Sequence, residues 1–163
     1  MKRLKKQNKI VFYIVIILIL FFIWSNSFDN QTVSLSKSNH IKEIFVDRLA
    51  ALLSHDNPLV VFITVNLRKC AHFFEFACLG VVIMIVQTVN KRLIIQDIYN
   101  MLSLSVIIAV IDEFIQIYTG RGSSVRDVVI DFTGFLSGTV LTAIISIIIS
   151  LIKVRKKNKK QSV

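Results

Sequence analysis

The sequence predicts an all-α membrane protein, a bundle of about four transmembrane helices. Of its 163 residues, 54% are hydrophobic, and it contains one proline and five glycines. This composition argues against a soluble globular domain. The apolar residues gather in about four blocks, each near the ~20 residues that a helix needs to cross ~30 Å of hydrocarbon. We therefore expect a single polytopic domain over residues 1–163.

The first span is expected at about residues 10–25. Five basic residues and no acid precede it, and Tyr13 and Trp24 fall near its two ends, where aromatic rings favour the membrane interface. Ser25 and Ser27 also form the small-x-small pattern of a signal-peptide cleavage site. A transmembrane helix is preferred over a cleaved signal peptide because the downstream segments are themselves apolar enough for the membrane.

A polar outer loop is predicted over residues 26–67. Within it, residues 41–53 place apolar side chains at helical spacing opposite charged ones. This pattern favours an interfacial helix that lies on the membrane surface or covers the mouth of the bundle; an ordinary packed helix is the alternative. Asn57 and Pro58 have the order of an N-cap and first-turn pair, so a helix is expected to start there and lead into the second span.

The remaining three spans are expected at about residues 70–89, 98–118 and 125–152. Gly120 is positioned as a left-handed stop after the third span. Ser124 and Asp127 have the spacing of a capping box at the start of the fourth span. Gly134 and Gly138 form a GxxxG pattern, which allows two helices to pack closely in a membrane.

Both termini are predicted to be cytoplasmic. The net charge of +10 arises mainly at the two ends of the chain and in a short loop with Lys91 and Arg92. This distribution is typical of membrane topology rather than of nucleic-acid binding. In this orientation thirteen of the 20 Lys and Arg residues are on the inner side, as the positive-inside rule requires.

Polar stripes interrupt the last three spans toward their predicted outer ends. They are Arg68, His72 and Glu75 on the second span, Asp112 and Gln116 on the third, and Asp127 and Asp131 on the fourth. A charge at the centre of a bilayer costs roughly 2.5–3.5 kcal/mol on insertion scales. We therefore expect the stripes to face one another in one polar pocket that opens to the outside and is built from the second to fourth spans.

Two groups of residues make up the predicted site. The candidate catalytic residues are His72, Glu75, Asp112, Glu113 and Asp131. The candidate ligand-binding residues are Arg68, Lys69, Gln116, Arg121 and Arg126. No metal or cofactor is assigned from the sequence, because it contains no HExxH, GxSxG, P-loop or dinucleotide-binding motif.

Three motifs carry a resemblance to a known family. RKxxHFxEFxxLG begins at Arg68, DExxQ at Asp112 and GRxxSxxDxxxDxxG at Gly120. Together they resemble the VanZ-like family over roughly residues 68–138, although this chain has Asp131 where the family usually shows Asn. The family is named for an accessory membrane protein that lowers sensitivity to the glycopeptide teicoplanin in Gram-positive bacteria. The resemblance implies a multi-pass protein of the bacterial cell membrane with such a role.

Three functions are compatible with these residues. The first is binding of an anionic lipid headgroup or a lipid-linked envelope precursor, because guanidinium groups at the membrane surface suit phosphate recognition. The second is an intramembrane enzyme in which Glu75 orients His72 as a base and Asp112, Glu113 and Asp131 supply an acid or hold a divalent metal. The third is purely structural, with the buried charges forming ion pairs that lock the helices together.

Overall fold

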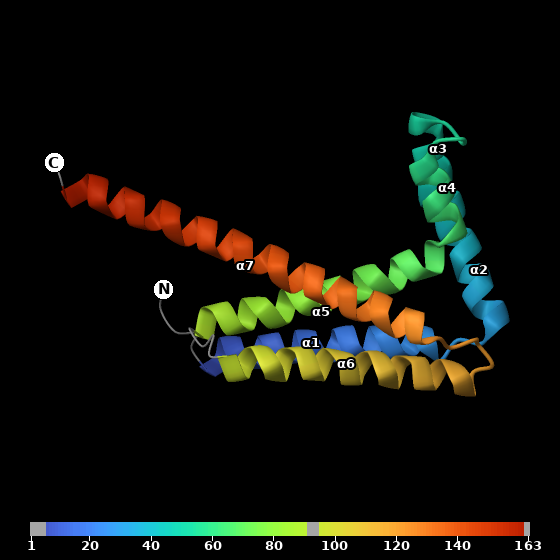
Figure 1. Cartoon of the computed structure of the whole chain (residues 1–163), viewed down its shortest axis with the longest axis horizontal. Helices are drawn as coiled ribbons and strands as arrows, with labels where there is room; N and C mark the ends of the chain where they lie inside the picture. Colours follow the sequence, from blue (N-terminus) through green and yellow to red (C-terminus); the bar gives the residue numbers. More distant parts are fainter. Residues whose placement is uncertain (1–5, 91–94, 162–163) are drawn as a thin grey trace.

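The computed structural model describes residues 6–90 and 95–161, and this part of the chain is helical apart from short turns (Figure 1). Its four long helices are α1 (Lys6–Ser27), α5 (Leu67–Asn90), α6 (Ile95–Tyr118) and α7 (Val125–Gln161). Each is long and apolar enough to cross a membrane. The all-α prediction with four membrane-spanning helices is confirmed. The predicted loop with Lys91 and Arg92 lies outside the described residues.

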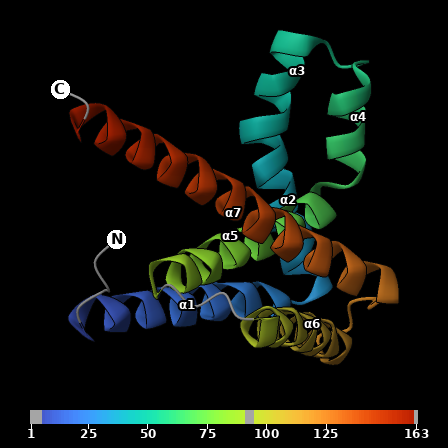
Figure 2. The ribbon, with the colours of Figure 1, turned by 60° about the vertical axis from the view of Figure 1, so that its left-hand side comes forward.

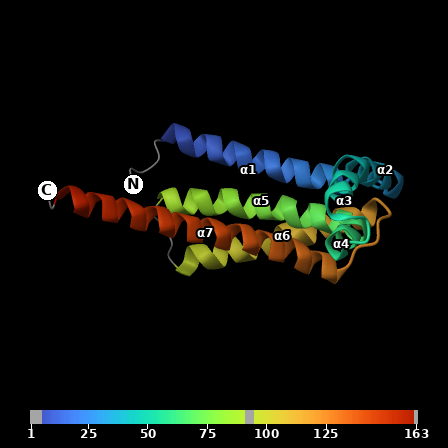
Figure 3. The same cartoon turned by 90° about the horizontal axis from the view of Figure 1, so that it is seen from above.

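The four long helices alternate in direction. The C-terminal ends of α1 and α6 therefore lie at the same end of the bundle as the N-terminal ends of α5 and α7 (Figures 1 and 3). The segment between α1 and α5 projects from this end, which we call the hairpin end. All the polar stripes identified in the sequence lie near it, because each stripe is close to the helix terminus located there.

The most extensive helix contact joins α5 and α7, and glycines make it possible. A β-carbon added to Gly134 would overlap the carbonyl oxygen of Phe73, and one added to Gly138 would overlap that of Ala77. Gly80 on α5 faces the carbonyl oxygen of Phe135 in the same way. The predicted GxxxG pattern thus places the backbones of α5 and α7 in direct contact. This contact holds His72 of α5 and Asp131 of α7 close together.

A helical hairpin connects α1 to α5. Its outgoing arm consists of α2 (Gln31–Ile41), the π-helical turn η1 (Lys42–Val46) and α3 (Asp47–Leu53), and its return arm is α4 (Pro58–Val65). Figure 1 shows both arms turned away from the long axis of the bundle, and Figure 2 shows them side by side. A small apolar core of Val46, Ala50 and Val60 joins the two arms. The hairpin would therefore extend along the plane of a membrane that the bundle crosses.

The hairpin begins earlier than the interfacial helix predicted at residues 41–53. Asn30 caps α2 by accepting a hydrogen bond from the backbone of Val33, so the polar stretch that follows is already helical. The predicted cap at Asn57 is confirmed, since its side chain accepts from Leu59 N and Pro58 occupies the first turn. The helix does not continue directly into the second span, because Asn66 leaves the helical conformation between α4 and α5.

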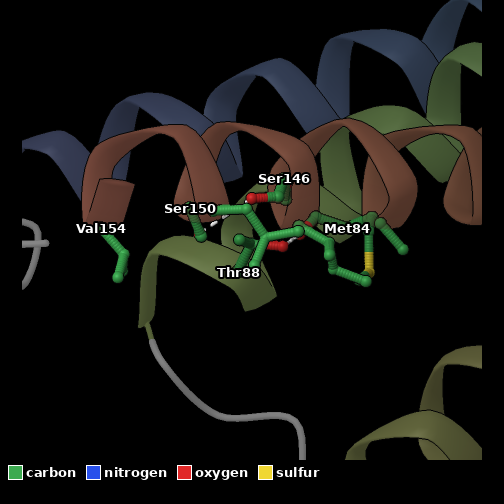
Figure 4. Close-up of a pocket in the computed structure, with 8 residues that line it drawn as sticks. Met84, Thr88, Ser146, Ser150 and Val154 are labelled. Carbon is green, nitrogen blue, oxygen red and sulfur yellow. Dashed lines mark hydrogen bonds between the residues drawn. The ribbon is translucent and has the colours of Figure 1, made fainter. Parts of the chain in front are cut away.

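The opposite half of the bundle is apolar. There α5 and α7 leave a cavity of about 290 Å³ between them, lined by Met84, Thr88, Ala143, Ser146, Ile147, Ser150, Leu151 and Val154 (Figure 4). The hydroxyls of Thr88 and Ser150 donate to carbonyl oxygens of their own helices, each at 2.8 Å. The rest of the lining is apolar except for Ser146, so the cavity offers few specific polar contacts to a ligand.

Candidate functional site

The polar stripes of α5, α6 and α7 meet inside the bundle at the hairpin end. The residues that they bring together are His72, Asp112, Glu113, Gln116 and Asp131, which we call the polar cluster. Asp112 has no exposed surface, and the exposed fractions of Glu113, Gln116 and Asp131 are 4%, 2% and 1%. Side chains from three different helices thus form one buried group, as the argument from bilayer energetics predicts.

His72 lies between two carboxylates. Its Nδ1 atom is 3.5 Å from Asp112 Oδ2 and 3.8 Å from Asp131 Oδ1. Glu75, which the sequence suggested as the partner of His72, instead accepts a hydrogen bond at 2.8 Å from the side chain of Asn26. The carboxylates that can orient or charge His72 are therefore supplied by α6 and α7 and not by its own helix.

A hydrogen-bond network organises the carboxylates of α6. Gln116 Nε2 donates to Asp112 Oδ2 at 2.9 Å and to Glu113 Oε1 at 3.0 Å. The second oxygen of Glu113 accepts from the backbone N–H of Ser124, also at 3.0 Å. Both oxygens of Glu113 are thus occupied, and its second bond ties the end of α6 to the start of α7.

This arrangement corrects the capping box predicted for Ser124 and Asp127. The Ser124 hydroxyl does cap α7, since it accepts from the backbone N–H of Arg126 at 3.1 Å. The reciprocal bond to the Ser124 N–H comes from Glu113 and not from Asp127. Asp127 Oδ1 is instead buried, and no residue in the described part of the chain donates a hydrogen bond to it. Only a residue distant in the sequence could supply this half of the cap, so local spacing could not reveal it.

The first helix also contributes to the site, which the sequence did not indicate. Ser27 donates from its hydroxyl to Asp112 Oδ1 at 2.6 Å, and Asn26 Nδ2 bonds Glu75. The Asn26 carbonyl oxygen also accepts from Arg121 Nη1 at 2.9 Å. In the sequence, Asn26 and Ser27 are visible only as polar residues at the end of the first apolar block. Their position does not show whether their side chains face the other helices or the solvent.

The cations divide into two groups. Arg121 is buried and Arg68 is half-buried, whereas Lys69 and Arg126 are exposed. Within residues 6–90 and 95–161, no Lys or Arg forms an ion pair with a carboxylate of the polar cluster. The ion pairs that the structural interpretation requires are therefore not formed by the described residues, apart from the approach of His72 to the two aspartates.

A cavity of about 80 Å³ opens beside the polar cluster. Its lining comes from α1, α2, α5 and the α6–α7 turn, and comprises Asn26, Asp29, Ser34, Lys37, Ser38, Ile41, Leu67, Arg68, Ala71, His72, Glu75 and Arg121. Lys37 is paired with Asp29 at 2.6 Å. Burial, followed by the positive charge of Arg68, lowers the pKa of the Arg121 guanidinium below its ordinary value. The cavity thus brings two arginines together, and a bound anion would relieve their repulsion.

Comparison with known proteins identifies one family. The family model described as VanZ/LLP1 matches residues 10–147. No curated protein and no solved structure matches the chain. The matched range includes the whole polar cluster and every residue that lines the 80 Å³ cavity. The resemblance seen in the motifs is thereby confirmed.

Proposed function

The chain belongs to the VanZ/LLP1 family, and we propose that it is a multi-pass protein of the bacterial cell membrane that binds an anionic lipid or a lipid-linked cell-wall precursor. The observation that carries this proposal is the cavity at the hairpin end, which holds Arg68 and Arg121. Arg68 has no carboxylate partner within the described residues, so its charge is available to a ligand.

The chemistry of the two arginines favours a phosphate group. A guanidinium presents several N–H donors in a planar fork that matches phosphate oxygens, and Arg–phosphate contacts are often bidentate. Arg121 is held in place by its bond to the Asn26 carbonyl oxygen, while its Nε atom is buried without a partner. One positioned donor and a neighbouring free guanidinium are suited to a headgroup phosphate.

The location of the cavity favours a lipid rather than a soluble anion. It lies where membrane-spanning helices end, which is the depth of the phospholipid headgroups. The adjacent hairpin exposes large apolar side chains, including Phe45, Leu52, Phe62 and Val65. Such a surface is suited to the boundary between headgroups and acyl chains. A lipid could thus present its headgroup to the arginines while its chains stay in the bilayer.

We assign the cavity to the outer leaflet, since the positive-inside pattern predicts cytoplasmic termini. Lipid-linked wall precursors are displayed on that side of the membrane in Gram-positive bacteria, where glycopeptides act. A protein that occupies such precursors would reduce susceptibility to teicoplanin. The family resemblance supports this part of the proposal.

One observation favours an enzyme as the second candidate. His72 lines the cavity and also approaches Asp112 and Asp131, so a headgroup bound there would meet an imidazole that lies close to two carboxylates. This is the arrangement of a general base or acid. In this alternative the bound envelope lipid is chemically altered instead of being held.

Retention and turnover of a labelled lipid separate the two candidates. We would incubate the full-length protein in nanodiscs with a radiolabelled polyprenyl pyrophosphate lipid. A binder retains up to one lipid per chain, and Arg68→Gln lowers its affinity about tenfold or more, roughly 1.4 kcal/mol. Arg48→Gln, an exposed hairpin arginine with the same charge change, retains full binding.

Each outcome of this experiment is decisive. If a product accumulates beyond one turnover and His72→Ala does not form it, the protein is an enzyme and not a lipid-binding protein. If the wild type and Arg68→Gln retain the lipid equally, the cavity is not the lipid-binding site. Absence of both retention and turnover overturns it.

A further inference from the structure

Asp131 is a buried carboxylate to which no described residue donates a hydrogen bond. Its exposed fraction is 1%, and neither of its oxygens has a partner within residues 6–90 and 95–161. Buried polar groups in native structures are nearly always paired, and an unpaired buried carboxylate is especially costly. Nδ1 of His72, which faces Asp131, also lacks a hydrogen-bond partner. The Asp131 carboxylate and His72 Nδ1 face each other and are both unsatisfied, which indicates that a ligand or ion binds between them.

We propose that His72, Asp112 and Asp131 form a binding site for one divalent transition-metal cation, such as Zn²⁺ or Mn²⁺. Each residue comes from a different helix, and one ligand atom from each lies within 4.8 Å of the other two. The inference does not depend on the lipid-binding proposal, because it concerns a buried site beneath the cavity and can be tested with metal alone.

The distances are close to those of a coordination sphere. The Nδ1 atom of His72 is 3.5 Å from Asp112 Oδ2 and 3.8 Å from Asp131 Oδ1. Zinc–ligand bonds of about 2.0–2.2 Å at tetrahedral angles place neighbouring ligand atoms roughly 3.4 Å apart. The two His72 distances are within a few tenths of an ångström of this spacing, whereas the carboxylate oxygens of Asp112 and Asp131, which lie within 4.8 Å of each other, would have to approach by up to about 1.4 Å to share one ion.

The partners of Asp112 support the same assignment. Ser27 and Gln116 each donate a hydrogen bond to this carboxylate and fix its orientation. Metal-binding carboxylates are commonly held in this way by residues that do not touch the metal. Glu113, which the sequence suggested as a metal ligand, is not one of the three residues whose ligand atoms converge, and its oxygens accept from Gln116 and from the Ser124 N–H. His72 takes its place.

The charge balance also favours a cation. In the described parts of the chain, neither Asp112 nor Asp131 is paired with a Lys or Arg. Protonation of His72 or of a carboxylate is the competing way to neutralise the site. An imidazolium would be expected to donate a hydrogen bond of about 2.7–2.9 Å to a carboxylate, whereas both observed distances are longer. A divalent ion would give Asp131 and His72 Nδ1 a partner and would balance the charge of both aspartates.

The ligand types narrow the choice of ion. A space of about 10 Å³ beside the ligand set is lined by Arg68, Lys69, His72, Glu113, Gln116, Asp127, Ile130 and Asp131, and Asp112 does not line it. Ca²⁺ and Mg²⁺ prefer oxygen ligands alone, whereas an imidazole with two carboxylates suits Zn²⁺ or Mn²⁺.

Metal titration of the purified protein tests the site. We would treat the full-length protein in detergent with a chelator, remove the chelator and titrate Zn²⁺ or Mn²⁺, with Mn²⁺ followed by electron paramagnetic resonance. The wild type is expected to bind one ion per chain, and Asp131→Asn and His72→Ala to lower the affinity about tenfold or more. Asp47→Asn is the control, since it makes the same change at an exposed aspartate of α3 outside the ligand set and should retain binding.

Thermal melting provides a second readout that separates lost binding from lost folding. Saturating metal should raise the melting temperature of the wild type and of Asp47→Asn, because a ligand that binds only the folded state stabilises it. Metal should not change the melting temperature of Asp131→Asn, provided that this variant is helical and monodisperse. If Asp131→Asn does not fold, the test of the metal site rests on the number of ions bound by the wild type and on the metal affinity of His72→Ala. A wild type that binds neither ion overturns the proposal, as do variants that bind metal as tightly as the wild type.

Discussion

Ser27 of α1 donates a hydrogen bond of 2.6 Å to Oδ1 of Asp112 on α6, and neither residue has any exposed surface. The other oxygen of Asp112 accepts from Gln116. Both oxygens of this buried carboxylate are thus satisfied, one by its own helix and one by the first helix of the chain. The first span is therefore part of the polar cluster's support and not only a membrane anchor.

Replacing Ser27 with alanine should destabilise the bundle. The change removes a donor to a buried carboxylate, which costs about 1–3 kcal/mol when the acceptor is left unpaired. The free energy of unfolding in mixed detergent micelles would measure the loss. Ser25→Ala is the matched control, because the Ser25 hydroxyl is exposed and donates only to a carbonyl oxygen of its own helix. Equal stability of the two variants would contradict a role for the Ser27 bond.

Adding a methyl group at Gly138 should separate α5 from α7. Its β-carbon would overlap the carbonyl oxygen of Ala77, and a backbone atom cannot move aside as a side chain can. Overpacking of this kind costs about 1–3 kcal/mol and occasionally more. Gly122→Ala is the control, since a β-carbon there meets nothing within 4 Å. Thermal melting of both variants by circular dichroism would show the difference.

Replacing Glu113 with glutamine should loosen the start of α7. The two carboxylate oxygens accept from Gln116 and from the Ser124 N–H, whereas a glutamine offers only one oxygen. Either the Gln116 side chain or the Ser124 N–H then lacks an acceptor, which lowers the stability by about 1–3 kcal/mol. Hydrogen exchange of the amides in the first turn of α7 should accelerate. Asp127→Asn should leave that exchange unchanged; faster exchange in this variant would restore the capping box predicted from the sequence.

Teicoplanin susceptibility should depend on residues at the cavity. We expect the wild type, expressed in a susceptible Gram-positive host, to lower teicoplanin susceptibility, and His72→Ala and Glu75→Gln to lack this effect, because both side chains line the cavity. The minimal inhibitory concentration measures the effect, and immunoblots of membrane fractions measure protein abundance. Arg48→Gln should protect as the wild type does. If the two variants disappear from the membrane, the buried polar residues act mainly in folding.

Accessibility labelling should place the hairpin outside the cell. Ser36 is exposed on α2, so a Ser36→Cys variant lacking Cys70 and Cys78 should react with a membrane-impermeant maleimide in intact cells. Ser34→Cys is a control on the same helix, since Ser34 is buried and should react more slowly. Labelling of Ser36→Cys only after lysis would reverse the topology and move the cavity to the cytoplasmic side.

Sequence patterns determined the features that depend on local spacing. Hydropathy located the four spans, since the length of an apolar block and the thickness of a bilayer suffice for that. The spacing of Gly134 and Gly138 indicated a close helix contact, and the helical period put the charged residues on defined faces. The cost of charge in hydrocarbon then required those faces to meet.

Only the tertiary structure decided which atoms meet. It placed His72 beside Asp112 and Asp131 instead of Glu75, and replaced Asp127 by Glu113 at the start of α7. It also brought Ser27 into the cluster and left Asp131 without a partner in the described chain. These relations depend on how far each helix is rotated and shifted along its axis. Glycine contacts between backbones set the rotation and shift of α5 against α7, and sequence spacing alone does not encode them.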